Sequence, residues 1–114
     1  MAKVVIIKFG DKAGMLVLPA SHKVDFKKIM KLAGTKNVRL ATEKEFKALF
    51  PDCEIGAMPP FGSLYNIPVS VDKALTKNER IIFNAGSHKD TVKMNLRDFD
   101  RLEKPALADF SVHM

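Results

Sequence analysis

The chain has 114 residues, 46% hydrophobic and 28% charged, which suggests one domain over residues 1–114 and excludes a disordered or fibrous protein. No apolar run is long enough to cross a bilayer, no secretory signal opens the chain, and one cysteine cannot form an internal disulfide, so we expect a cytoplasmic protein with no membrane partner. The net charge of +6 favours a polyanionic partner such as nucleic acid, although many small basic proteins have no such partner.

The first third of the chain predicts a hairpin followed by a helix. The β-branched residues 3–9 predict a strand buried on both faces, residues 10–14 a turn, and residues 15–20 the returning strand. Residues 21–34 predict a helix that ends at Gly34 and carries lysines on its outer side. Its apolar side is expected to contain Val24, Phe26, Ile29, Met30 and Leu32.

A short strand and a capped helix are predicted next. Residues 37–41 predict the strand, and residues 42–50 predict a helix that stops at Pro51. Thr42 and Glu45 have the spacing of a capping box, in which each side chain accepts a hydrogen bond from the other residue's amide.

The second half of the chain predicts three more strands, over residues 67–71, 79–86 and 91–95. Residues 95–104 predict a helix with Asn95 as its N-cap. The side chains expected to face inward from it are Leu96, Phe99 and Leu102. Hairpins dominate this order of elements, so we predict an α+β fold around a mixed, mainly antiparallel sheet.

The stretch CEIGAMPPFG, residues 53–62, is unusual for a connecting loop. Gly56 and Gly62 permit close approach to the backbone, while Pro59 and Pro60 fix the path of the chain. A rigid loop of this kind can direct its amides at a developing oxyanion, and Phe61 is the aromatic residue expected nearest a ligand. The alternative is that the loop is only a stiff connection between a helix and a strand. The residues alone favour this structural role over a ligand-binding one.

Other chemistry has weak support. Cys53 lies between Asp52 and Glu54, which oppose thiolate formation, so we expect a small filling residue and not a nucleophile. The three histidines lack ligand spacing, and we expect no metal and no cofactor. Ser87, His88 and Asp90 contain the residue types of a catalytic triad, but neighbours along a tight turn rarely point at one another.

Three segments carry a resemblance to a known family. They are residues 17–34, residues 40–72 with the Gly-x-x-x-Pro motif Gly56 to Pro60, and residues 81–94 with the turn NAGSH. Together they resemble the YbaK/ProX family of aminoacyl-tRNA deacylases, which are related to the editing domain inserted in bacterial prolyl-tRNA synthetases.

The resemblance implies a barrel-like mixed sheet with helices around it, and hydrolysis of the ester that joins a wrong amino acid, such as alanine or cysteine, to the 3′-terminal adenosine of tRNA. It implies a family lysine at Lys3, which would bind the terminal phosphate or ribose. The amides of Gly56, Ala57 and Met58 would then bind the oxyanion. The substrate would be bound by Pro60, Phe61, Gly62, Gly86, Ser87 and His88. The partners implied are the tRNA acceptor end, which the lysine-rich residues 21–34 are expected to meet, and prolyl-tRNA synthetase; the oligomeric state is left open.

The family usually has several dozen residues before this lysine, whereas here only Met1 and Ala2 precede it. We therefore expect a fragment, a short-start gene model or a reduced member. A noncatalytic tRNA- or protein-binding module of the same fold is the alternative function.

Overall fold

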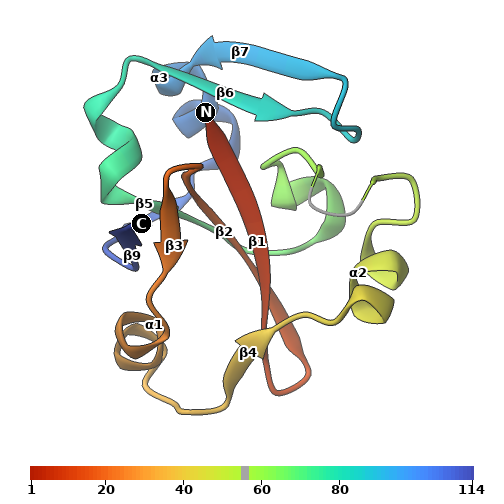
Figure 1. Cartoon of the computed structure of the whole chain (residues 1–114), viewed down its shortest axis with the longest axis vertical. Coiled ribbons are helices and arrows are strands. Elements are labelled where there is room, and N and C mark those ends of the chain that lie inside the picture. Colours follow the sequence, from red (N-terminus) through yellow and green to blue (C-terminus); the bar gives the residue numbers. More distant parts are fainter. Residues whose placement is uncertain (55–56) are drawn as a thin grey trace.

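The computed structural model describes residues 1–54 and 57–114, so Gly56 lies outside the described residues. A central sheet crosses the molecule, with a separate hairpin at one end and helices at its sides (Figure 1). The strands are β1 (Ala2–Phe9), β2 (Lys12–Pro19), β3 (His22–Val24), β4 (Val38–Leu40), β5 (Val69–Asp72), β6 (Arg80–Asn84), β7 (Thr91–Asn95), β8 (Ala106–Ala108) and β9 (Ser111–His113). The helices are α1 (Phe26–Ala33), α2 (Glu43–Leu49) and α3 (Leu96–Glu103), with short 3₁₀ turns η1 (Gly62–Tyr65) and η2 (Lys73–Lys77).

The central sheet has the strand order β4-β1-β2-β5-β8. The predicted β1–β2 hairpin is confirmed: its strands pair antiparallel from Ala2 opposite Pro19 to Phe9 opposite Lys12, and Gly10 turns the chain at a φ of +59°. β4 adds antiparallel to β1, whereas β2–β5 and β5–β8 are parallel. The predicted α+β fold with a mixed, mainly antiparallel sheet is confirmed, but the sheet stays open and does not close into a barrel.

β1 is buried on both faces, as predicted, and this divides the core in two. Val4 and Ile6 belong to a large cluster that includes Met58 and Phe83. Side chains of the alternate residues, such as Ile7, belong to a smaller cluster on the opposite face. The first cluster lies on the side of the loop that contains Met58, and the second lies beneath α1, which contributes Ile29 to it.

Helix α1 differs from the prediction for residues 21–34. The chain first forms β3, which pairs with β9, and the helix begins only after Asp25. Asp25 caps it by accepting hydrogen bonds from the Lys27 amide at 3.0 Å and the Lys28 amide at 3.5 Å. Gly34 ends the helix in the left-handed region, as predicted, whereas Leu32 is 58% exposed and does not belong to the core.

The predicted capping box of α2 is confirmed. The Glu45 amide donates to the Thr42 hydroxyl at 3.2 Å, and the Thr42 amide donates to the Glu45 carboxylate at 2.9 Å. The Arg39 guanidinium also donates to both Glu45 oxygens, at 2.6 and 2.9 Å. These hydrogen bonds lower the pKa of Glu45 to about 2, and the bonding to Arg39 has the largest effect.

Helix α3 buries Leu96 and Phe99, as predicted. Leu102 is 66% exposed, because the helix turns this residue away from the sheet, so its predicted inward position is wrong. Asn95 occupies the N-cap position, but its side chain makes no capping hydrogen bond. None of the helices in the described part of the chain is long and apolar enough to span a membrane.

The strands β8 and β9 were not predicted. β8 is the edge strand of the central sheet, and a buried carboxylate of β5 holds the start of β9. Asp72, 2% exposed, accepts hydrogen bonds from the Phe110 amide at 3.0 Å and the Ser111 amide at 3.1 Å, while its other oxygen accepts one from the Ala74 amide at 3.0 Å. Burial favours the neutral acid and would raise its pKa, but these hydrogen bonds outweigh burial and hold the pKa of Asp72 below its ordinary value.

Candidate functional site

The loop of residues 57–62 is packed into the core and is not an exposed wall. Ala57 and Met58 are 0% and 3% exposed. Phe61 lies against Phe83 and Phe99, with ring centroids 5.5 and 5.7 Å apart, so its ring contributes to the core. The apolar residues that made this loop conspicuous in the sequence therefore anchor it, and only its main chain and rim can face a ligand.

The loop and the turn between β6 and β7 are joined by main-chain hydrogen bonds. The Glu54 amide donates to the Gly86 carbonyl at 2.8 Å, and the Gly86 amide donates to the Ala57 carbonyl at 2.7 Å. The Glu54 carboxylate also accepts a bond from the His88 amide at 3.3 Å. Two segments that are distant in the sequence and that both carry predicted site residues are thus brought together.

Gly86 is required at this junction by its conformation. Its φ is +96°, a region that side-chain-bearing residues rarely adopt, and a Cβ there would lie 4.0 Å from the Cys53 sulfur. The obstacle to substitution is therefore backbone strain and not lack of space.

The amides expected to bind the oxyanion differ in whether they already donate a hydrogen bond within the protein. The Ala57 amide donates to the Glu54 carbonyl at 3.0 Å, so it is used inside the loop and does not point at a ligand. The Met58 amide has no hydrogen-bond partner among the residues that the structure describes. Gly56 lies outside them.

Ser87 stabilises its own turn. Its hydroxyl donates to the Asp90 carboxylate at 2.8 Å and accepts from the Lys89 and Asp90 amides, both at 3.2 Å. The hydroxyl proton is therefore directed at a carboxylate and not at an imidazole, and the weak triad signal in the sequence does not correspond to a catalytic arrangement.

The structure does not bring the Lys3 side chain to the loop. Ala2 and Val4 face the cluster that contains Met58, so strand alternation places Lys3 on the opposite face, where its cross-strand neighbour is Leu18. Lys3 is half-buried near the start of β1.

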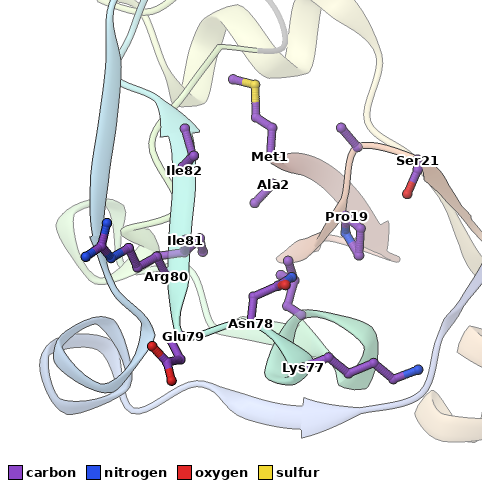
Figure 2. A pocket seen from close by; sticks show the side chains of 12 residues that line it. Met1, Ala2, Pro19, Ser21, Lys77, Asn78, Glu79, Arg80, Ile81 and Ile82 are labelled. Carbon is purple, nitrogen blue, oxygen red and sulfur yellow. The ribbon is translucent and has the colours of Figure 1, made fainter.

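The pockets around the loop also depart from expectation. A loop that directs its amides at a ligand would be expected to border the main pocket, but the cavity of about 750 Å³ contains none of residues 57–62 in its lining. Figure 2 shows this cavity between Ala2 and Pro19 on one side and Ile81 on the other. The loop instead contributes Met58 to a smaller, mostly apolar pocket of about 250 Å³ at the edge of β1. That pocket is lined by Val4, Val5, Ile6, Leu40, Ala41, Thr42, Glu43, Phe46 and Met58.

Two contacts near the loop could not be read from the sequence. Glu103 of α3 accepts from the Ser63 amide at 3.1 Å and from the Ser63 hydroxyl at 2.5 Å, which fixes the end of the loop. The Cys53 sulfur lies 3.8 Å from the Tyr65 hydroxyl. Burial, and then this contact, raises the pKa of Tyr65, so the phenol is not a base that could activate the thiol at neutral pH.

The histidines form no metal site within the described part of the chain, where no three metal-ligating side chains come together. His22 and His113 are paired across β3 and β9, with ring centroids 5.2 Å apart, and a His22 ring nitrogen lies 3.0 Å from the Ser111 hydroxyl. This pair lies next to the C-terminal strand, away from the loop.

Comparison with known proteins gives the class. The family model described as the aminoacyl-tRNA editing domain matches residues 1–102, and the chain belongs to this family. No curated protein sequence matches the chain.

Solved structures share the fold at low sequence identity. The hypothetical protein APE2540 superposes with a TM-score of 0.87 at 23% identity, over 98% of this chain and 74% of that one. A candidate trans-editing enzyme for prolyl-tRNA synthetase gives a TM-score of 0.84 at 21% identity, over 97% of this chain and 69% of that one. A protein from Marinobacter aquaeolei VT8, described as a signal transduction protein, gives a TM-score of 0.83 at 21% identity. This match covers 97% of this chain but only 24% of that one.

Proposed function

We propose that this chain is a trans-acting aminoacyl-tRNA deacylase that hydrolyses mischarged tRNA, with tRNA(Pro) carrying alanine or cysteine as its substrate. The observation that carries the proposal is the junction between the loop and the turn, where Gly86 exchanges hydrogen bonds with Glu54 and Ala57 in a chain of the editing family. The name of the trans-editing relative supports prolyl-tRNA as the substrate type and prolyl-tRNA synthetase as a partner.

The reaction needs positioning more than it needs a strong nucleophile, because an aminoacyl ester is already activated. Water adds to the carbonyl carbon, and the carbonyl oxygen takes up the negative charge. The bond to the ribose oxygen then breaks, this oxygen gains a proton, and the amino acid and the tRNA are released. Amides held in a rigid loop stabilise the charged intermediate without reorganisation. Because the Ala57 amide is used inside the loop, we assign this role to Met58 and, from the sequence motif, to Gly56.

The small pocket beside Met58 is the place we assign to the amino-acid side chain. Its apolar lining suits an uncharged side chain such as that of alanine or cysteine. A synthetase site built for proline excludes smaller amino acids by only about 1–3 kcal/mol, so a second, smaller site is needed to remove them.

The remaining predicted residues form the rim of this site. Gly86, Ser87 and His88 would contact the amino group or adenosine from the turn. The loop residues Pro60, Phe61 and Gly62 would hold the opposite rim in place. Lys3 keeps its role as a point charge for the terminal phosphate or ribose from the family resemblance alone, because the fold places its side chain on the face opposite the loop.

The first test compares two glycine substitutions. Gly86→Ala and Gly34→Ala both place alanine at positive φ, +96° and +69°, with no contact closer than 4.0 Å, so both introduce backbone strain without a steric clash. Only Gly86 lies at the proposed site, so hydrolysis of alanyl- and cysteinyl-tRNA(Pro) should fall at least about tenfold in Gly86→Ala relative to Gly34→Ala. Equal activity in the two folded variants would remove the junction from the mechanism.

The second test concerns Lys3. Lys3→Ala should fold, because a strand-end lysine buries little apolar area, and it should change both KM and kcat since phosphate binding also positions the ester. Rates equal to wild type would make Lys3 a solvated strand end. A wild-type protein that binds tRNA without hydrolysing either substrate would favour the alternative of a noncatalytic binding module.

A further inference from the structure

The β6–β7 hairpin has an outer face that the core does not use. Ile81 and Phe83 point inward and are 2% and 1% exposed, so the alternate residues of β6 point outward. The strand register places Arg80 opposite Asn95, Ile82 opposite Lys93, and Asn84 opposite Thr91. These six residues define the hairpin face: Arg80, Ile82, Asn84, Thr91, Lys93 and Asn95.

The hairpin face carries positive charge without an acidic member. Arg80 and Lys93 are diagonal neighbours across the two strands, which places their Cα atoms about 7–8 Å apart. Figure 2 shows the Arg80 side chain extending from β6 toward β7. Two carboxylates lie nearby. Asp98 is bound by Arg101 at 3.0 Å, which reduces its effect on the two cations, and Glu79 precedes Arg80 and lines the cavity of Figure 2.

The chemistry of this face fits a nucleic-acid backbone. An arginine fork and a lysine ammonium both bind phosphate, the first in a bidentate manner. Ile82 lies opposite Lys93 and next to Arg80 on the same face, and it is 37% exposed, which offers an apolar contact to a ribose or base. Further hydrogen-bonding groups of the kind that contact sugar and phosphate come from the side-chain amides of Asn84 and Asn95 and from the hydroxyl of Thr91.

The hairpin face continues directly into the candidate site. β6 ends at Asn84, and Gly86, two residues later, donates to the Ala57 carbonyl of the loop. Four residue steps along β6, from Asn84 to Arg80, span about 13 Å at about 3.3 Å per residue. Nucleotides just before a 3′ end bound at the loop would therefore lie within reach of Arg80 and Lys93.

Helix α1, which the sequence made the expected contact for the acceptor stem, lies elsewhere. Figure 1 shows α1 at the end of the molecule opposite the hairpin. Its buried residue Ile29 packs with Ile7 near the far end of β1. The exposed Lys27 and Lys31 of α1 thus provide similar charge without proximity to the site.

We propose that the hairpin face binds the sugar–phosphate backbone of the tRNA acceptor arm and positions its 3′ end over the loop. This inference rests on the proposed function for its choice of RNA. It assigns the hairpin, and not α1, as the surface that recognises the substrate beyond its terminal nucleotide.

The experiment compares two double charge reversals, Arg80→Glu/Lys93→Glu on the hairpin and Lys27→Glu/Lys31→Glu on α1. Both change the net charge by the same amount, so a difference between them reports location. Binding of uncharged tRNA(Pro) is measured by fluorescence anisotropy over a range of salt concentrations. The hairpin variant should bind at least about tenfold more weakly, and its log–log salt slope should be smaller by about 1.4–1.8, since each of the two lost phosphate contacts contributes about 0.7–0.9.

The neutral variant Arg80→Gln/Lys93→Gln should show the same loss of salt slope, which separates lost contacts from new repulsion. Equal weakening in the hairpin and α1 variants, or a hairpin variant that binds like wild type, would overturn the inference. So would a wild-type protein that does not bind tRNA.

A substrate without a stem separates this inference from the proposed function. Hydrolysis of 3′-O-alanyl-adenosine should be unchanged in the hairpin variant, because this ester has no phosphate for Arg80 or Lys93 to bind. Wild-type protein that binds tRNA through the hairpin face but hydrolyses neither ester would support the inference and refute the proposed function. Loss of nucleoside hydrolysis in the hairpin variant would show instead that the substitutions distort the site, and would contradict the assigned role.

Discussion

Replacement of Asp72 by alanine should be among the most destabilising single changes in this chain. The carboxylate accepts the Phe110, Ser111 and Ala74 amides, and the first two bonds are buried. Each buried amide left without an acceptor costs about 1–3 kcal/mol, and loss of the cap at Ala74 costs about 1 kcal/mol more. A total near 4 kcal/mol is a large part of the roughly 5–15 kcal/mol that stabilises a typical domain.

The assay is thermal unfolding followed by circular dichroism. A loss of about 4 kcal/mol should lower Tm by about 16 °C, at about 4 °C per kcal/mol for a chain of this size. The exposed Asp109, which pairs with Lys28 at 3.0 Å, provides the matched control, and Asp109→Ala should cost less than about 1 kcal/mol. If Asp72→Ala melted within about 3 °C of wild type, the Phe110 and Ser111 amides would have other acceptors and the reasoning would be wrong.

The same residue predicts a pH dependence. The folded-state pKa of Asp72 is lowered, so its stabilisation is fully present above the ordinary pKa of about 3.9 and is lost as the pH falls through the lower folded value. The difference in Tm between wild type and Asp72→Asn should therefore be constant from about pH 5 to 8 and should narrow below about pH 4. A difference that widened on acidification would contradict the assigned direction.

Three further changes test the loop and its supports. In Gly62→Ala the new Cβ would overlap the Ile67 carbonyl oxygen, so we expect the free energy of unfolding in urea to fall by about 1–3 kcal/mol. An unchanged urea midpoint would mean that the loop shifts at little cost. Cys53→Ser should keep deacylation within about twofold of wild type, because the sulfur contacts only the Tyr65 hydroxyl among the hydrogen-bonding groups described, and complete inactivity of the folded variant would make the thiol essential. Thr42→Ala should lower the free energy of unfolding by about 1 kcal/mol through loss of its cap, and an unchanged urea midpoint would mean that the capping bonds contribute little.

Local signals explain what the sequence predicted well. The β1–β2 hairpin combines two β-branched runs with a glycine turn, and the α2 capping box is set by residues three positions apart. Each of these depends on neighbours along the chain, so periodicity and turn chemistry are sufficient to find it. The same holds for the left-handed stop at Gly34.

Long-range pairing explains what was missed. Residues 22–24 were assigned to a helix because their partner, β9, is a three-residue strand near the other end of the chain, and so short a segment carries no period of its own. Leu32 and Leu102 were expected on the inner sides of their helices, but both are exposed, because helical spacing alone does not show which residues of an apolar side another element covers.

The candidate site was found in the sequence by its glycines and prolines, and not by its side chains. Those residues marked a loop and a turn that the structure joins, but their meeting at Gly86 depends on main-chain hydrogen bonds that no sequence pattern encodes. For the same reason, the inward packing of Phe61 and the internal use of the Ala57 amide could be learned only from the fold.

The bonds between the loop and the turn have a consequence for how such domains diverge. Both Gly86 bonds join peptide groups, which every residue except proline supplies in full, so most side-chain replacements at Glu54 and Ala57 leave the donors and acceptors in place. Under the proposed function, mutation can then change the lining of the pocket beside Met58, and with it the amino acid accepted there, while the joined loop and turn persist. A domain built in this way can acquire a new specificity by gradual sequence drift without first having to rebuild its catalytic geometry.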